Sequence, residues 1–544
     1  MTRAQFCANR SERETAVNQN RKGIEVKTTK RIAIKNHIHL LLFAAVLGVL
    51  ASGCTTYQQM NKKVVLYWRQ GNLTKAVVEA TKMADANAKN KNAIICRLEQ
   101  GAVMRANSQY DDSNKAFDTA QDKIDAYSQK AKVRLGQEAG ALLSNQANLD
   151  YEGRAYDAIM LNTYSALNNL AMGEPDKARP ELIRAYQRQQ DAVEENKRRI
   201  EAAQAQAKAA AATPRSASKK KGASTIKSKP DTSATVTTNT DLSTNITAVT
   251  TNTNSSVAIE KAQKDPKFQT AINTNYTYLD NLKPYANYVN PFTVYLDGLF
   301  FMANAADASD LERAHKSLER VVGFDPDNNY VKDDLATVDA LIQGKPLAPT
   351  TYVIFETGCA PVRDQIRIDI PIIVTKVSYV GAAFPTLKPQ DNYFPSLTVT
   401  ANGTNATTAL VADMDSVIGL DFKNELPIII TKTIASTVTK AVIAYAGSEA
   451  AKQGGGDLGQ LIFNVGNVLY NVTVNIADER TWTTLPKQFQ ACHIPTPPDR
   501  KIVLETPNGI QKIPVTIEDG TINIIYVKSI NPGTPLLVTQ MKLK

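Results

Sequence analysis

The sequence predicts a multidomain chain of mixed α and α/β composition, in which an α-helical solenoid precedes a β-rich α+β domain. Two changes in the sequence pattern predict this division. From Tyr57 to about Ala212, apolar residues and alanines recur at the three- and four-residue spacing of packed helices. After the connector Lys345–Pro349, apolar and polar residues alternate as they do in half-buried strands. We therefore expect a helical domain over residues 54–345 and a β-rich domain over residues 346–544.

Residues 1–53 are predicted to be a leader with a lipoprotein signal peptide. Basic residues precede an uncharged run from Leu40 to Leu50, which is too short for a bilayer that needs about 20 residues. A signal-peptide core of about 7–15 residues fits this length. The following Ala51-Ser-Gly-Cys54 resembles the lipobox of bacterial lipoproteins, in which the cysteine thiol carries a diacylglyceryl group. The alternative is a buried N-terminal helix with a core cysteine.

This resemblance implies that Cys54 anchors the mature chain to a membrane. Two or more acyl chains, at about 0.8 kcal/mol per buried methylene, give stable anchoring. Thr55 follows the cysteine, and by the same resemblance a residue other than Asp there favours the outer membrane. We therefore expect a lipid-anchored protein of the outer membrane that faces the periplasm. Met1–Lys30 are expected to lie upstream of the true translation start.

The formal net charge of +10 does not indicate a nucleic-acid-binding protein. A net six positive charges belong to the leader, and six cations without acids lie in residues 213–230, so the rest of the mature chain comes to about −2. A groove for nucleic acid requires its positive charge on the folded surface. Nucleic acid is therefore not an expected partner.

A phrase that recurs along the helical region marks the expected joints of helical hairpins. Residues Gly71–Ala76, Tyr110–Ala116 and Gly173–Ala178 each place Asp, Asn or Ser before a Lys-Ala pair, and Asp310–Ala314 repeats the phrase loosely. Such turn residues accept the free amide hydrogens of the next helix. The small Ala lets two helices cross closely.

These hairpins resemble tetratricopeptide repeats, most closely in the unit from Tyr295 to Asp327. The alanines of successive phrases lie 40, 62 and 136 residues apart, whereas the family's repeat has about 34 residues. We therefore expect a few degenerate hairpins in an irregular solenoid. A plain helical bundle is the alternative.

Residues 213–258 are predicted to be a disordered insertion within the helical domain. The stretch is rich in Lys and Ser at its start and in Thr, Asn and Ser further on. It has too few bulky apolar side chains to offset the entropy of ordering. Helices are expected to resume at about Glu260.

The segment Asn290–Met302 is the richest aromatic run in the chain. On a helix, Phe292 and Tyr295 share one face. Core packing explains such a stripe. The alternative is a concave surface in which Phe292, Tyr295 and the nearby Tyr285 bind a partner peptide.

The β-rich domain is predicted to contain inserted helices at about 422–452 and, as helix or strand, at 457–476. Apolar residues recur at helical spacing through the first of these, with Pro427 tolerable only in its first turn. Lys432 and Lys440 lie inside it, which argues for a buried amphipathic helix and against a membrane span.

The strands of this domain are predicted from alternation and from turn signals. Asn508-Gly509 and Asp519-Gly520 are tight-turn signals, so the last three strands are expected to form a meander. The expected strands are Thr351–Phe355, Ile366–Ile372, Ser396–Ala401, Thr408–Met414, Lys501–Glu505, Ile510–Ile517 and Thr521–Lys528.

No catalytic constellation is visible in the sequence. Cys96 is expected in the core, and a disulfide between Cys359 and Cys492 is left open. In the mature chain His315 and His493 are the remaining histidines, without a second His at metal-ligand spacing. Cys492 and His493 are neighbours on a predicted strand and should point to opposite faces. We expect no metal, no cofactor and no enzymatic activity.

The densest polar cluster is Asp478-Glu-Arg480, two residues before Trp482. A carboxylate–guanidinium pair under an indole is a candidate ligand site. The alternative is that the cluster fixes the strand that follows it.

Three phrases together resemble a family of bacterial envelope lipoproteins that have tetratricopeptide-like helices and no assigned biochemical activity. They are Asn290–Leu299, Tyr352–Pro361 and Ala477–Pro486. The resemblance implies an architecture and a compartment, but no reaction.

Three functions remain open on this basis. The first is a lipid-anchored periplasmic scaffold or adaptor that binds an envelope protein or peptide through its helical repeats. The alternatives are an envelope enzyme that acts on peptidoglycan or polysaccharide near Asp478–Trp482, and a structural part of a secretion or motility assembly.

Overall fold

The computed structural model describes residues 56–133, 149–211, 253–371, 379–454 and 477–544. Met60–Lys544 forms one compact unit, and Met1–Gln59 forms a separate unit that is described from Thr56 onward. The expected leader, Cys54, most of the expected insertion at 213–258 and the segment 457–476 lie outside the described residues. Within the described ranges, none of the helices has the length and apolarity that crossing a bilayer requires.

Two of the recurring phrases, Gly71–Ala76 and Gly173–Ala178, contain the turn between two helices, as predicted, whereas Tyr110–Ala116 and Asp310–Ala314 lie within helices. Gly71 and Gly173 have positive φ angles of 67° and 73°, and each lies in the turn between two helices. The Oδ1 atom of Asn72 accepts a hydrogen bond from the Lys75 amide at the start of the following helix. The helices of this region are α2 (Tyr57–Arg69), α3 (Leu73–Ala86), α4 (Ala93–Ala106), α5 (Tyr110–Val133), α6 (Ala155–Ala171) and α7 (Pro175–Ala211).

A second run of helices follows at α9 (Thr253–Lys264), α10 (Pro266–Tyr276), the 3₁₀ helix η3 (Thr277–Asn281), α11 (Pro291–Ala303), α12 (Ala308–Phe324) and α13 (Asn329–Ile342). Helix α9 begins at Thr253, so the last six residues of the expected insertion are helical. Helices therefore resume seven residues before the expected position, Glu260. The alanines of the recurring phrases, Ala76, Ala116, Ala178 and Ala314, are all buried. The small side chain therefore lies where neighbouring helices pack, as the sequence predicted.

The strands form three sheets in the part of the chain after residue 349. A five-stranded sheet has the order β11-β10-β1-β7-β6, with β1 parallel to β10 and the other pairs antiparallel. A four-stranded sheet has the order β5-β4-β8-β9, and β2 pairs with β3. The strands are β1 (Thr350–Thr357), β2 (Val362–Pro371), β3 (Tyr379–Lys388), β4 (Thr398–Ala401), β5 (Thr404–Thr407), β6 (Ala409–Asp413), β7 (Gln488–Pro495), β8 (Lys501–Glu505), β9 (Lys512–Thr516), β10 (Ile522–Ser529) and β11 (Leu537–Lys542).

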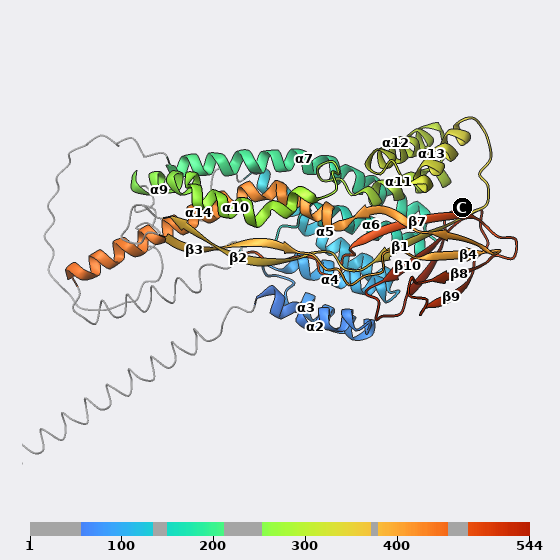
Figure 1. Ribbon diagram of the computed structural model, residues 1–544, viewed down its shortest axis with the longest axis horizontal. Helices are drawn as coiled ribbons and strands as arrows, with labels where there is room; N and C mark the ends of the chain where they lie inside the picture. The colour runs from blue at the N-terminus through green and yellow to red at the C-terminus, as the bar shows by residue number, and fades with distance from the viewer. Residues whose placement is uncertain (1–55, 134–148, 212–252, 372–378, 455–476) are drawn as a thin grey trace, which may run out of the picture. The chain divides into compact units, whose positions relative to one another are not determined.

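The five-stranded sheet lies between the helices and the four-stranded sheet (Figure 1). On β1, Val353 and Phe355 belong to one apolar core with Val399 of β4 and Leu504 of β8. The alternate residue Glu356 points to the helices, where its carboxylate accepts a hydrogen bond from the Tyr164 hydroxyl at 2.8 Å. The period-two alternation of a strand therefore separates an apolar face from a face that meets the helices.

Glu356 is buried at this junction and has several partners. The Tyr526 hydroxyl donates to it at 2.5 Å, and Lys528 Nζ also donates to it. Burial raises the pKa of Glu356, but Lys528 and Arg105 outweigh burial and hold it below its usual range. A buried carboxylate that stays ionised requires such partners.

Helix α14 (Met414–Gly454) begins eight residues before the expected start at 422. Asp413 explains the difference, because its Oδ1 accepts a hydrogen bond from the Asp415 amide and its Oδ2 one from the Ser416 hydroxyl. Pro427 consequently lies inside the helix and not in its first turn, which corrects the expectation. The helix ends at Gly454, within the glycine triplet.

The predicted meander of the last three strands is wrong. Strands β8 and β9 pair across the Asn508-Gly509 turn, but β10 lies in the other sheet, beside β1. Burial decides this placement, because all eight residues of β10 are buried, as a strand between two neighbours requires. Strands β3, β5 and β11 were not predicted, and β7 was expected only as the strand that carries Cys492 and His493.

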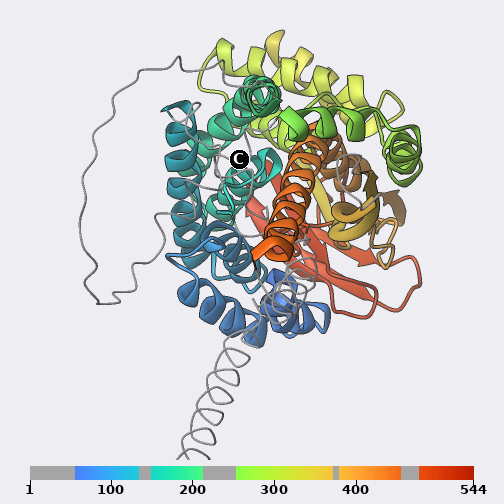
Figure 2. The same cartoon turned by 90° about the vertical axis from the view of Figure 1, so that its left-hand side faces the viewer.

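A mixed α+β class is therefore confirmed, with helices before residue 345 and sheets after it. In Figure 2 the helices follow one another in chain order, from blue to yellow-green, around the strands and α14. The secondary structure changes at 345/346, but buried side chains join the two halves. That this boundary separates two domains stays a prediction.

Candidate functional site

The aromatic residues proposed to bind a partner are buried, which corrects that hypothesis. Phe292 and Tyr295 are 0% exposed and Tyr285 is 6% exposed. The Phe292 ring stacks on Phe489 of β7 with centroids 3.9 Å apart and planes at 1°. The sheet therefore fills the face that a peptide groove would need, and core packing explains the aromatic stripe.

Tyr295 belongs to a buried polar cluster around Asp334 of α13. The hydroxyls of Tyr295 and Tyr352 each donate to the Asp334 carboxylate at 2.9 Å, and His493 Nε2 lies 3.6 Å from it. Burial raises the pKa of Asp334 to about 6, against the opposing effect of His493. Cys492, in contrast, lies in the core on the opposite face of β7, so the predicted separation of Cys492 and His493 is confirmed.

Cys96, Cys359 and Cys492 are free and buried in the described part of the chain, so Cys359 and Cys492 form no disulfide. Burial raises the pKa of the Cys96 and Cys492 thiols to about 12. A thiol is a nucleophile as the thiolate, and these two remain protonated at neutral pH. Cys96 is a core residue, as predicted.

Asp478 and Arg480 form the predicted ion pair, and it is buried. Arg480 Nε and Nη2 donate to the two Asp478 oxygens at 2.7 and 3.0 Å, while Nη1 donates to the Leu149 carbonyl at 2.8 Å. Burial raises the pKa of Asp478, but Arg480 and Arg154 outweigh burial and lower it. The pair therefore fixes the chain before α6 to the segment before β7.

Trp482 does not cover this ion pair, contrary to the expected arrangement. Its ring is 0% exposed and meets Phe117 and Tyr164 edge-on, each with centroids 5.9 Å apart. Glu99 of α4 is also 0% exposed and accepts hydrogen bonds from the Thr483 amide at 2.6 Å and the Thr484 hydroxyl at 2.8 Å. The cluster at 478–484 is thus structural, as the alternative interpretation held.

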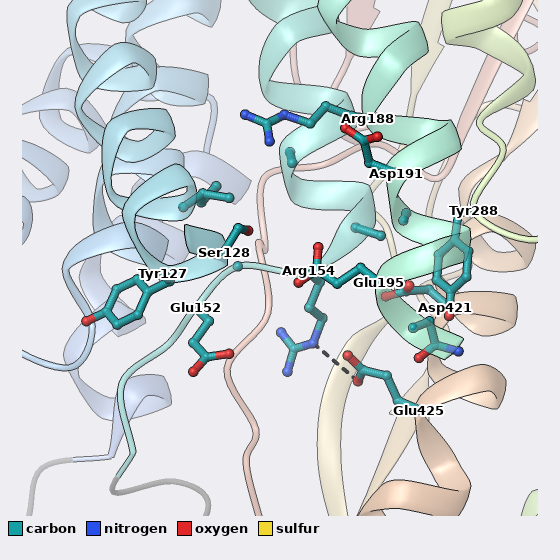
Figure 3. Close-up of a pocket in the computed structure, with 16 residues that line it drawn as sticks. Tyr127, Ser128, Glu152, Arg154, Arg188, Asp191, Glu195, Tyr288, Asp421 and Glu425 are labelled. Atoms are coloured by element: carbon teal, nitrogen blue, oxygen red, sulfur yellow. Dashed lines mark ion pairs between the residues drawn. The ribbon is translucent and has the colours of Figure 1, made fainter. Parts of the chain in front are cut away.

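A pocket lies close to this cluster, and Arg154 lines it. Arg154 Nη2 is 3.7 Å from Asp478 Oδ2, and Arg154 Nε is 3.8 Å from Glu425 Oε2 (Figure 3). The pocket draws on α5, the 152–154 turn, α6, α7, the loop before α11, and α14. Its lining residues are Ile124, Tyr127, Ser128, Glu152, Gly153, Arg154, Ala155, Ala158, Arg188, Asp191, Ala192, Glu195, Asn196, Tyr288, Asp421 and Glu425.

Two carboxyl groups of α14 enter this pocket. Asp421 and Glu425 are four residues apart and therefore share one face of the helix. Arg363 Nη2 donates to Glu425 at 2.9 Å. Burial raises the pKa of Asp421 to about 8, Glu425 acts in the same direction, and Arg363 and Arg154 oppose it. The pocket thus combines a carboxyl group held by arginine with a second one whose pKa is raised by burial.

Two residues of the pocket have unusual backbone conformations. Gly153 has φ of 85°, and a Cβ there would lie 2.9 Å from the Ile124 side chain. Tyr288 has φ of 60°, which for a bulky residue costs on the order of 1–3 kcal/mol. The fold therefore holds Tyr288 against the pocket at a local conformational cost.

The sequence analysis did not identify this pocket. Its residues come from separated segments, and none belongs to a spacing motif. Among the described residues, no group of three His, Cys, Asp or Glu side chains is placed to bind a metal ion. One feature of the sequence could have indicated the pocket: Asp421 and Glu425 lie at helical spacing in a segment otherwise rich in apolar residues.

Comparison of the chain with protein-family models, with curated proteins and with solved structures finds no match.

The contact of Glu99 with the 483–484 segment predicts a large loss of stability in Glu99→Ala. Removing the carboxylate leaves the partly buried Thr483 and the buried Thr484 donors without this acceptor, at a cost of about 2–4 kcal/mol. The matched control is Glu79→Ala, which removes surface ion pairs with Lys63 and Lys82 and should cost under about 1 kcal/mol. Urea unfolding followed by circular dichroism measures both, and equal losses would contradict the assignment.

The raised pKa of Asp421 predicts a pH-dependent difference between the wild type and Asp421→Asn. The folded chain keeps this proton up to about pH 8 and the unfolded chain up to about pH 4, so stability is lost as pH rises through this window. Asparagine does not ionise, so the variant should be close to the wild type at pH 4 and more stable at pH 9, by about 1 kcal/mol or more.

The measurement is urea unfolding of both proteins at pH 4, 7 and 9. Asp334 and Asp415 also have pKa values raised to about 6, but they titrate in both proteins and cancel in the difference. The exposed Asp519→Asn serves as the control, with no expected change in the profile. Parallel curves for the wild type and Asp421→Asn would refute the assignment.

Proposed function

We propose that the chain is a lipid-anchored scaffold or adaptor of the bacterial cell envelope, attached to the outer membrane through Cys54 and facing the periplasm. In this proposal the helices bind an envelope protein or an extended peptide. The order of helix packing supports it, because α3 packs on α4, α4 on α5, α5 on α6 and α6 on α7. Packing between sequence neighbours is the arrangement of a solenoid, which is the tetratricopeptide-like interpretation of this array.

The partner surface of the proposal lies on the outer helices. Phe292, Tyr295 and Tyr285 are buried, so these residues take no part in it. Leu66 of α2 and Val78 of α3 are 49% and 47% exposed, and both belong to the helices that follow the expected anchor most closely in the chain. A surface on α2 and α3 is therefore the one that follows the proposed anchor most closely along the chain.

Photo-crosslinking in intact cells tests the adaptor proposal. A photoreactive phenylalanine derivative at position 66 or 78 should join the chain to the same envelope protein. The same derivative at position 519, whose Asp side chain is fully exposed, is the control and should give no such product. The Cys54→Ala variant should lose the product, and an alkyne fatty acid should label the wild type but not this variant.

No product at positions 66 and 78, or an identical product at 519, would contradict the adaptor surface. Equal fatty-acid labelling of the wild type and Cys54→Ala would contradict the anchor. The labelling result therefore tests the location of the protein, and the crosslinking result tests its function.

A second candidate function, an envelope enzyme that acts on peptidoglycan or polysaccharide, is favoured by the pocket. Glycoside hydrolysis requires two carboxyl groups in different environments, and the pocket holds two: Asp421, whose pKa burial raises, and Glu425, which accepts a hydrogen bond from Arg363. The purified chain should then release soluble fragments from peptidoglycan or polysaccharide, with at least a hundredfold loss in Asp421→Asn. Equal rates in the wild type and Asp421→Asn would exclude this role for the pocket.

A further inference from the structure

Two buried side-chain atoms of pocket residues, Asp421 Oδ2 and Arg188 Nε, have no hydrogen-bond partner among the described residues. Asp421 is 3% exposed, and its Oδ2 atom meets no donor from the described protein. Buried carboxyl oxygens are otherwise almost always hydrogen-bonded. Asp421 lines the pocket, so a molecule bound there is in a position to supply the missing donor.

The terminal nitrogens of the two pocket arginines contact groups other than Asp421. Arg154 Nη1 donates to the Tyr151 hydroxyl and to the Arg480 carbonyl, each at 2.7 Å. Arg188 Nη2 contacts Asp125. Neither guanidinium donates a described hydrogen bond to Asp421, although both line the pocket.

The balance of charge around the pocket selects a cation. Four carboxyl groups besides Asp421 line it, against the two guanidinium groups of Arg154 and Arg188. Glu152, Asp191 and Glu195 are exposed, so they surround the entrance with negative charge. Such an entrance raises the local concentration of cations and repels anions.

The acceptors and rings of the pocket suit an ammonium group. Asp421 and Glu425 present carboxyl oxygens from one face of α14, and Tyr288 lies beside Asp421 (Figure 3). An ammonium group has three N–H donors and no acceptor, and it is attracted to the face of an aromatic ring. A divalent metal ion requires more oxygen ligands than this, and the described residues provide no such group.

We propose that the pocket between α5, α7 and α14 binds the primary ammonium group of a small organic cation, with Asp421 and Glu425 as its acceptors. The ammonium enters past the carboxylates of Glu152, Asp191 and Glu195 and donates to Asp421 Oδ2 in its ionised form, which the positive charge of the bound group favours. A polyamine and the side-chain amine of an amino acid or peptide share this chemistry. The inference depends neither on the adaptor function nor on the enzyme function.

Isothermal titration calorimetry of the full chain in mild detergent tests the proposal. The probes are 1,4-diaminobutane for the polyamine source and Nα-acetyl-L-lysine for the amino-acid source. Tetramethylammonium is the matched control ligand, because it carries the charge without N–H donors. Saturable binding of at least one amine, at least tenfold tighter than tetramethylammonium, is expected, and the tighter probe identifies the source.

Two variants locate the binding. Asp421→Asn preserves shape and should weaken amine binding at least tenfold. Ala192→Trp, on the α7 wall of the pocket, should block binding without altering a carboxylate. The surface variant Glu79→Gln should bind as the wild type does, and circular dichroism confirms that each variant is folded.

The outcomes that overturn the proposal are no saturable binding of either amine, equal binding of tetramethylammonium, or unchanged affinity in folded Asp421→Asn and Ala192→Trp. Amine binding without fragment release from peptidoglycan or polysaccharide would support the ammonium site and count against the enzyme candidate.

Discussion

The burial of carboxylates between the helices and the strands is the constraint on which the rest of this structure depends. Glu99, Glu356 and Asp334 are each at most 1% exposed, and each accepts hydrogen bonds from groups that lie far away in the sequence. A buried carboxylate without partners is strongly unfavourable, so the helices and the sheet are stable only in contact. Met60–Lys544 is accordingly one compact unit, although its two halves follow different sequence patterns.

The same constraint explains the character of the pocket. Arg154 and Arg480 find carboxylate or carbonyl acceptors inside the protein, and Glu425 is held by Arg363. Asp421 alone among these groups has an oxygen that no described residue serves. Its raised pKa is the electrostatic consequence of that position, because burial disfavours its charged form. The buried ion pair of Asp478 and Arg480 therefore lies beside the pocket, and Arg154 contacts Asp478 and also lines the pocket.

The candidate site lay beyond sequence reasoning for a geometric reason. Arg154, Tyr288 and Asp421 are separated by more than a hundred residues each, and only the packing of α14 against α6 and α7 brings them together. The aromatic residues that sequence did single out, Phe292 and Tyr295, are apolar enough to bind a peptide or to fill a core. Periodicity gives the face of a helix, but not what covers that face.

The sequence by itself determined the helix joints, the mixed α+β class and the alternation that places Cys492 and His493 on opposite faces of one strand, because these follow from turn chemistry and local period. Its indications of a leader and of lipidation at Cys54 concern residues outside the described structure. Only the tertiary structure decided which strands pair. It placed β10 beside β1 and not beside β9, and it showed that buried carboxylates join helices to strands. Those outcomes depend on burial between distant segments, which local patterns do not encode.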